Sequence, residues 1–99
     1  MSRIVIYHCF GGTHSSIIAA NLHLGRLPWQ GAIEGAQFLS LTYFDQLDGN
    51  HLGLIIPHGQ DEGGNLVCTV ARHSEAILTE NLLLSFSQLL GVDLVMVNA

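Results

Sequence analysis

The feature that most constrains the fold is a short apolar run, Ile4–Tyr7, followed by the glycine pair at Gly11 and Gly12. An apolar, β-branched run that ends at a glycine turn is typical of a buried strand. The residues after the turn are rich in Ser and Thr, which cap helices, and they continue into an apolar pattern that reaches Gly25. The sequence therefore predicts a strand, a tight turn and a helix over residues 14–24.

The second half of the chain predicts a hairpin, a long helix and a last strand. Two strands, Leu52–Ile56 and Leu66–Ala71, are separated by a turn-rich stretch that contains Asp-Glu-Gly-Gly-Asn, and Pro57 suits an irregular part of this hairpin. A helix capped by Ser74 is expected to run to Leu90 and to stop at the glycine that follows it. The apolar run Val92–Val97 is expected to be a central, parallel strand.

Together these segments predict one α/β domain over residues 1–99, with the order β-α-(α)-β-β-α-β. The bracketed helix stands for residues 31–41, which fit a short helix better than a strand. We expect a small two-layer or three-layer sandwich around a mixed sheet of about four strands, with parallel strands at its centre. A right-handed crossover would bring the last strand beside the first.

Composition excludes several classes of function. The chain has 8 acidic and 3 basic residues, a formal net charge of −5, and no lysine. No basic patch for nucleic acid or for an anionic membrane can be built from three arginines. We find no signal peptide and no apolar run long enough to cross a membrane. Two cysteines are too few for a disulfide scaffold, so a cytoplasmic protein with reduced thiols is expected.

The densest group of chemically active side chains lies in the loop from His8 to Ser16. Open α/β sheets bind ligands at the carboxyl ends of their strands, and the N–H groups at a helix start attract anions. The first hypothesis is therefore a site for a small anion or phosphometabolite, and its alternative is a simple turn with a helix cap. The expected ligand-binding residues are Gly11, Gly12, Thr13, His14, Ser15, Ser16 and Arg72.

Cys9 supports a second hypothesis, a phosphoryl- or acyl-transfer enzyme in which Cys9 is the nucleophile and His8 or His14 is the acid–base group. The arginine of a tyrosine-phosphatase loop is missing, because Ser15 stands six residues after the cysteine. Cys9, the glycine turn and the pair Ser15-Ser16 resemble the phosphocysteine loop of sugar-phosphotransferase IIB domains. That resemblance implies a cysteine that accepts a phosphoryl group held by helix-start amides. The alternative for Cys9 is a small buried apolar residue.

Two further hypotheses remain. His8, Cys9 and His14, with His58 and Cys68 nearby, contain zinc-binding residue types, but their spacing matches no recognised zinc motif, so no metal and no cofactor is expected. The helix ending at Leu90 is apolar on most sides, which is typical of a buried helix or of an oligomer interface. A homodimeric interaction module without catalysis is therefore the third functional alternative.

The remaining titratable side chains carry weaker signals. Asp61 and Glu62 lie beside a glycine pair, and a solvated hairpin turn is favoured over an acid–base pair. His23 and His51 are expected at the surface. Arg72 has a surface ion pair with an acidic residue of the following helix as its alternative role.

The motif Tyr-His-Cys-Phe-Gly-Gly-Thr-His-Ser-Ser at residues 7–16 resembles the opening of an uncharacterised family of Gram-positive bacterial proteins, a domain of unknown function. Leu24–Pro28, Tyr43–Asp45 and Asp61–Asn65 fall where that family has similar patterns. The resemblance covers most of the chain. It implies membership of a family and carries no activity with it.

Overall fold

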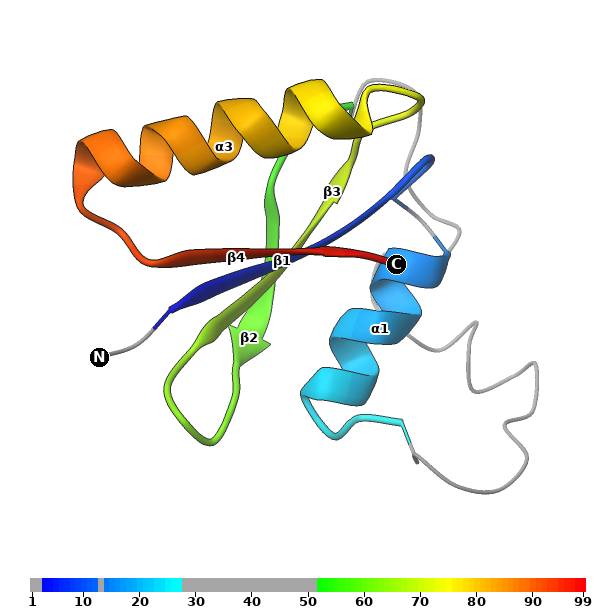
Figure 1. Cartoon of the computed structure of the whole chain (residues 1–99). Helices are drawn as coiled ribbons and strands as arrows, with labels where there is room; N and C mark the ends of the chain where they lie inside the picture. The colour runs from blue at the N-terminus through cyan, green and yellow to red at the C-terminus, as the bar shows by residue number, and fades with distance from the viewer. Residues whose placement is uncertain (1–2, 13, 28–51) are drawn as a thin grey trace.

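A computed structural model describes residues 3–12, 14–27 and 52–99 of the chain. The described elements follow the order β-α-β-β-α-β, as the sequence predicts for this α/β domain (Figure 1). The short helix expected over residues 31–41, and His51, lie outside the described residues. In chain order the elements are β1 (Ile4–Cys9), α1 (Ser15–His23), β2 (Ile56–Gln60), β3 (Leu66–Ala71), α3 (Ala76–Leu90) and β4 (Leu94–Asn98).

The four strands form one mixed sheet in the order β2-β3-β1-β4. Strand β1 pairs in parallel with both β3 and β4, and β2 pairs antiparallel with β3. The predicted mixed sheet with parallel strands at its centre is confirmed. The prediction that the last strand is central is wrong, since β4 is parallel but lies at an edge. An edge strand that contacts helices can be as apolar as a central one, so composition does not distinguish the two.

The sheet is the middle one of three layers, because α1 and α3 cover opposite faces (Figure 1). Side chains of β1 alternate between these faces. Tyr7 and Cys9 bond to residues of α1, while His8 bonds to Glu80 of α3. The alternation separates the two neighbours His8 and Cys9, and this separation decides which residues can act together.

Each face of the sheet has its own apolar cluster. On the α3 side, Ile6, Cys68 and Val70 are buried, and Leu83 packs against them. On the α1 side, Ile17 is fully buried and clusters with Leu27 and other apolar residues. Helix α1 buries four of its residues, whereas α3 buries none. Helix α3 thus contacts the sheet through few side chains, among them Leu83 and Glu80.

The hairpin differs from the sequence prediction in its first strand. Residues Ile56–Gln60 form that strand, and the apolar segment before it contributes only an isolated bridge between Leu52 and Ala71. The register shifts between Pro57 and Gly59, because proline has no N–H to donate to the ladder. The irregularity expected at Pro57 is therefore confirmed, and the strand expected over Leu52–Ile56 is wrong.

The helix ends follow the glycine signals more closely than the cap signals. Helix α1 ends at His23, one residue before the predicted end, and Gly91 ends α3 in the left-handed conformation, with φ at 69°. Ser74 does not cap α3, because Glu75 occupies the N-cap position and makes no side-chain cap bond. Among the described residues, no helix is long and apolar enough to cross a membrane.

Candidate functional site

The loops that leave β1 and β3 run side by side at the carboxyl edge of the sheet. The Arg72 N–H donates to the Cys9 carbonyl at 3.1 Å, and the His73 N–H donates to the Phe10 carbonyl at 2.8 Å. Gly12 turns the chain here with φ at 70°, and a Cβ on it would lie 2.7 Å from the Cβ of Ala71. The turn therefore rests directly on the end of β3, and only glycine allows that contact.

The turn and the start of α1 surround the sulfur of Cys9. The Gly12 N–H donates to Sγ at 3.1 Å, and Sγ lies 3.1 Å from Ser16 Oγ. In the thiol form the sulfur donates this second hydrogen bond, and in the thiolate form the Ser16 hydroxyl donates it. Cys9 and Ser16 are both buried. The sulfur thus sits at the positive end of a helix, which favours its ionised form.

The two cysteines of the chain have opposite electrostatic environments. Burial raises the pKa of Cys9, but hydrogen bonds from the side chain and backbone of Ser16, the Ser15 side chain and the Gly12 amide outweigh it, so the pKa is lowered. Cys68 faces the apolar cluster under α3, where burial alone raises its pKa. Burial is similar, so the difference comes from the donors around Cys9.

His8 is committed to the opposite face of the sheet. Its ring is fully buried, and its Nδ1 accepts a hydrogen bond from Arg72 Nε at 2.8 Å. A guanidinium only donates, so Nδ1 carries no proton and the proton is on Nε2. Nε2 donates to Glu80 Oε1 at 2.8 Å, and a second Arg72 nitrogen donates to Asn98 Oδ1 at 2.9 Å. His8 and Arg72 therefore link β1, β3, α3 and β4 across the α3 face.

The structure divides the residues that the sequence singled out. Cys9, Gly12, Ser15 and Ser16 converge at the start of α1, with Gly11 in the same loop. His14 is exposed at the N-cap position of α1 and provides no side-chain cap. Thr13 lies outside the described residues. His8 and Arg72 face away from Cys9, and within the described ranges no three His, Cys, Asp or Glu residues form a group that could hold a metal ion.

A partly exposed pair of stacked rings, Phe10 and His73, lies beside this loop. The rings of Phe10 and His73 are stacked, with centroids 4.8 Å apart and planes inclined by 11°. Phe10 is 61% exposed, and His73 adopts a positive φ of 47°, which is uncommon outside glycine. The stacked pair thus places two aromatic rings beside the loop that carries Cys9.

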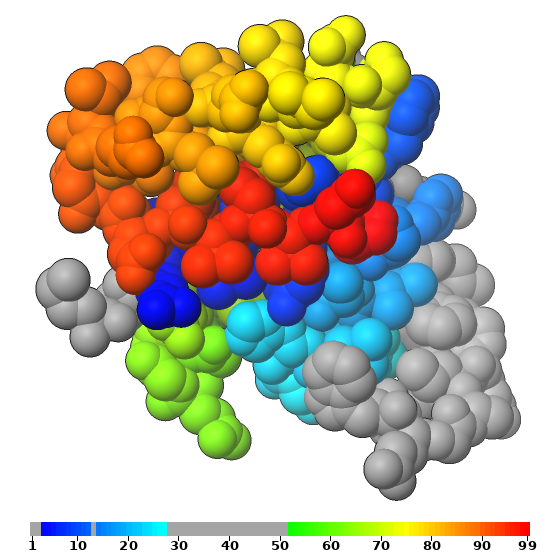
Figure 2. All heavy atoms as spheres, in the orientation of Figure 1, coloured from blue at the N-terminus to red at the C-terminus, as the bar shows by residue number. Residues whose placement is uncertain are grey.

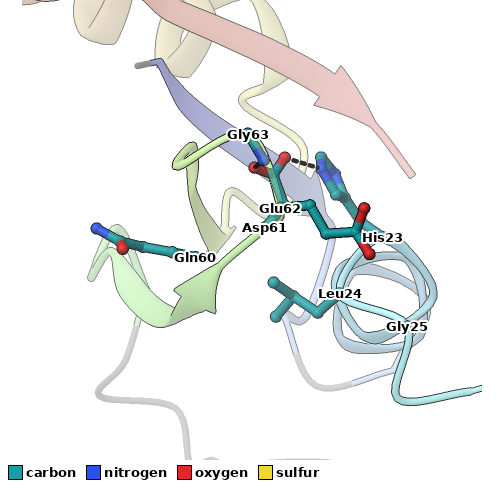
Figure 3. A pocket seen from close by; sticks show the side chains of 7 residues that line it. All are labelled: His23, Leu24, Gly25, Gln60, Asp61, Glu62 and Gly63. Atoms are coloured by element: carbon teal, nitrogen blue, oxygen red, sulfur yellow. Dashed lines mark hydrogen bonds and ion pairs between the residues drawn. The ribbon is translucent and has the colours of Figure 1, made fainter. Parts of the chain in front are cut away.

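A second group of titratable residues, which sequence reasoning missed, joins α1 to the hairpin. The Tyr7 hydroxyl and His23 Nδ1 are 2.7 Å apart, and His23 Nε2 lies 2.7 Å from Asp61 Oδ2. Figure 3 shows the His23 ring and the Asp61 carboxylate joined by this contact, and both side chains line a hollow of about 380 Å³. Only the fold brings these residues together, since 38 positions of sequence separate the last two.

Asp61 is the electrostatic centre of this group. Hydrogen bonds from Asn65 and His23, followed by a smaller one from Gly63, lower its pKa to about 2. Burial, with a smaller contribution from the negative charge of Asp61, raises the pKa of Tyr7. Tyr7, His23 and Asp61 thus form a continuous series of hydrogen bonds, which fastens the hairpin turn to α1.

Comparison with known proteins gives a family and no activity. The model of one family, described as "Protein of unknown function (DUF3189)", matches residues 4–99. No curated protein matches the chain, and no solved structure does.

Proposed function

The chain belongs to the DUF3189 family, whose function is unknown, and we propose that it is a group-transfer protein in which the Cys9 thiolate accepts a phosphoryl or acyl group. The observation that carries this proposal is the contrast between two buried cysteines. Among the described residues, amide and hydroxyl donors surround the Cys9 sulfur and not that of Cys68, and the pKa of Cys9 is lowered whereas that of Cys68 is raised. A thiolate at a helix start is a common form of activated nucleophile.

The donors around Cys9 favour this proposal over simple anion binding. A loop that only bound a free anion would direct its N–H groups to solvent. Here the Gly12 N–H and the Ser16 hydroxyl contact the sulfur. The anion that they stabilise is therefore the thiolate itself, and the same end of α1 would stabilise negative charge on an incoming group.

The transfer step follows from this geometry. The Cys9 thiol first loses its proton to solvent. A sulfur lone pair then attacks phosphorus or a carbonyl carbon, the S–P or S–C bond forms, and the bond to the leaving oxygen breaks with its electrons on that oxygen. The exposed His14 is the histidine of the loop that can protonate the leaving group. His8 does not take this part, since it bonds to Arg72 and Glu80 on the other face.

Acetyl phosphate tests the proposal, because this one reagent can donate either a phosphoryl or an acetyl group. The intact protein and its peptides are analysed by mass spectrometry after incubation. We expect a covalent adduct on Cys9 in the wild type and in a Cys68→Ser control, and none in a Cys9→Ser variant. Adducts at equal level on both cysteines, or none on Cys9, would contradict the proposal.

Reversible binding of a small anion is the second candidate function. It is favoured by the start of α1, where no side chain caps the helix. Inorganic phosphate would then raise the melting temperature of the Cys9→Ser variant as well as that of the wild type. Stabilisation that persists without the thiol, in the absence of any adduct, would replace the transfer proposal by this one.

A further inference from the structure

Helix α3 exposes an unusual amount of apolar surface. Figure 2 shows α3 across the top of the molecule, with its outward side uncovered in that view. The largest apolar patch of a typical monomer is about 300–600 Å². Seven large apolar side chains of this 15-residue helix are between 37% and 80% exposed, and they are Ile77, Leu78, Leu82, Leu84, Phe86, Leu89 and Leu90.

Four of these seven side chains lie on one flank of the helix, namely Leu78, Leu82, Phe86 and Leu89. Leu78, Leu82, Ser85 and Leu89 follow one another at spacings of 4, 3 and 4 residues, which is the seam spacing of packed helices. Phe86 lies on the same flank, one helical turn after Leu82. We call these five residues the α3 stripe.

The α3 stripe contains no charge. Glu80 is the single charged residue of α3, and it lies toward the sheet, bonded to His8. Two copies of a chain with net charge −5 repel one another in general, but they can meet through this uncharged surface. A partner with a charged surface would gain no ion pair here.

An apolar groove adjoins the stripe. It has a volume of about 230 Å³ and lies between the second half of α3 and the sheet, where Phe86 and Leu90 face Ile6 and Leu66. Helix α3 thus leaves part of the apolar surface between itself and the sheet uncovered. Side chains from a second helix can fill this groove and add apolar burial, at about 25 cal/mol per Å².

We propose that two copies of this chain form a dimer in which the α3 stripe of one packs against the α3 stripe of its partner about a two-fold axis. A standard interface buries about 800 Å² on each partner, and the α3 stripe supplies its apolar centre, since the four large side chains of the stripe are between 52% and 80% exposed. A two-fold axis places the same surface on both sides of the interface, which an uncharged stripe allows without repulsion.

Light scattering coupled to size-exclusion chromatography tests the dimer across a range of protein concentrations. We expect the wild type to have twice the mass of the chain. The double variant Leu82→Lys/Leu89→Lys should have the mass of one chain, because it places like charges across the interface. Ile77→Lys is the matched control, since Ile77 is 76% exposed on the other flank of the same helix, and it should remain a dimer.

A second measurement decides the case in which the double variant fails to fold. In a background of Cys9→Ser and Cys68→Ser, mild oxidation should link two chains of Ser85→Cys, which lies at the centre of the stripe. Leu84→Cys, which is 37% exposed on the other flank, should stay unlinked. A wild type with single-chain mass at every concentration would overturn the proposal, and so would a dimer that neither variant perturbs nor links.

Discussion

Gly12 is subject to two separate constraints. Its φ of 70° lies in the left-handed region, and its α-carbon faces the end of β3 so closely that a Cβ would lie 2.7 Å from that of Ala71. Gly25 has nearly the same φ, at 75°, but among the described residues other than its chain neighbours no atom lies within 4 Å of its would-be Cβ. A comparison of Gly12 with Gly25 therefore separates the effect of backbone strain from the effect of steric contact.

We predict that Gly12→Ala destabilises the protein by about 2–5 kcal/mol, since left-handed backbone contributes about 1–2 kcal/mol and overpacking about 1–3 kcal/mol. Gly25→Ala should lose only the first contribution, about 1–2 kcal/mol. Urea unfolding of both variants and the wild type measures the difference. Equal losses at the two positions would show that the turn does not rest on β3 as described.

The hairpin and α1 are joined by Asp61 rather than by apolar packing alone. Asp61 accepts hydrogen bonds from the Gly63 and Asn65 amides through Oδ1 and bonds to His23 through Oδ2. These bonds favour the ionised carboxylate and hold its pKa at about 2. Asp and Gly favour the hairpin turn for conformational reasons, and through Asp61 the same turn also holds α1 in place.

The pH dependence of stability follows from the sign of this shift. A carboxyl group whose pKa is lower in the folded state stabilises the protein above its unfolded value of about 3.9. That stabilisation is lost as the pH falls from about 4 through about 2. We predict that the melting temperature of the wild type exceeds that of Asp61→Asn at pH 5. The gap should narrow progressively toward pH 2, and a gap that stays constant would contradict the role of Asp61.

Local sequence patterns predict the helices and strands of this fold better than they predict which of those elements pair or pack together. Periodicity and terminal glycines identify α1 and the end of α3, because both signals depend on residues within one or two turns. The alternation of β1 also predicts that His8 and Cys9 face opposite sides. The strand expected over Leu52–Ile56 fails because an apolar run does not show which of its residues are paired.

The couplings within the site lie beyond such patterns. Arg72 reaches His8 across 64 positions, and Glu80 reaches the same ring across 72. These three side chains meet because β1 lies between β3 and β4 in the sheet. Local sequence patterns do not give this strand order. The position of Arg72 at the end of a predicted strand indicates the carboxyl edge of the sheet. It does not indicate on which face of the sheet the guanidinium lies.

At the scale of the whole molecule, each of the three arginine side chains bonds to another protein group. Arg3 pairs with Asp93 at 3.0 Å, Arg26 donates to the His58 carbonyl at 2.8 Å, and Arg72 bonds to His8. Among the residues that the structure describes, no arginine side chain hydrogen-bonds to Cys9 or to the start of α1. With no lysine in the chain, the positive potential at Cys9 comes from backbone N–H groups and the start of α1.

The central claim is that the start of α1 holds Cys9 as a thiolate, and the rate of iodoacetamide alkylation against pH tests it most directly. The measurement uses the Cys68→Ser variant, so that Cys9 is the one reactive thiol. We predict a midpoint below the ordinary cysteine pKa of about 8.5, and a rise of that midpoint when Ser16→Ala is added. A midpoint at or above the ordinary value, unchanged by Ser16→Ala, would contradict the account.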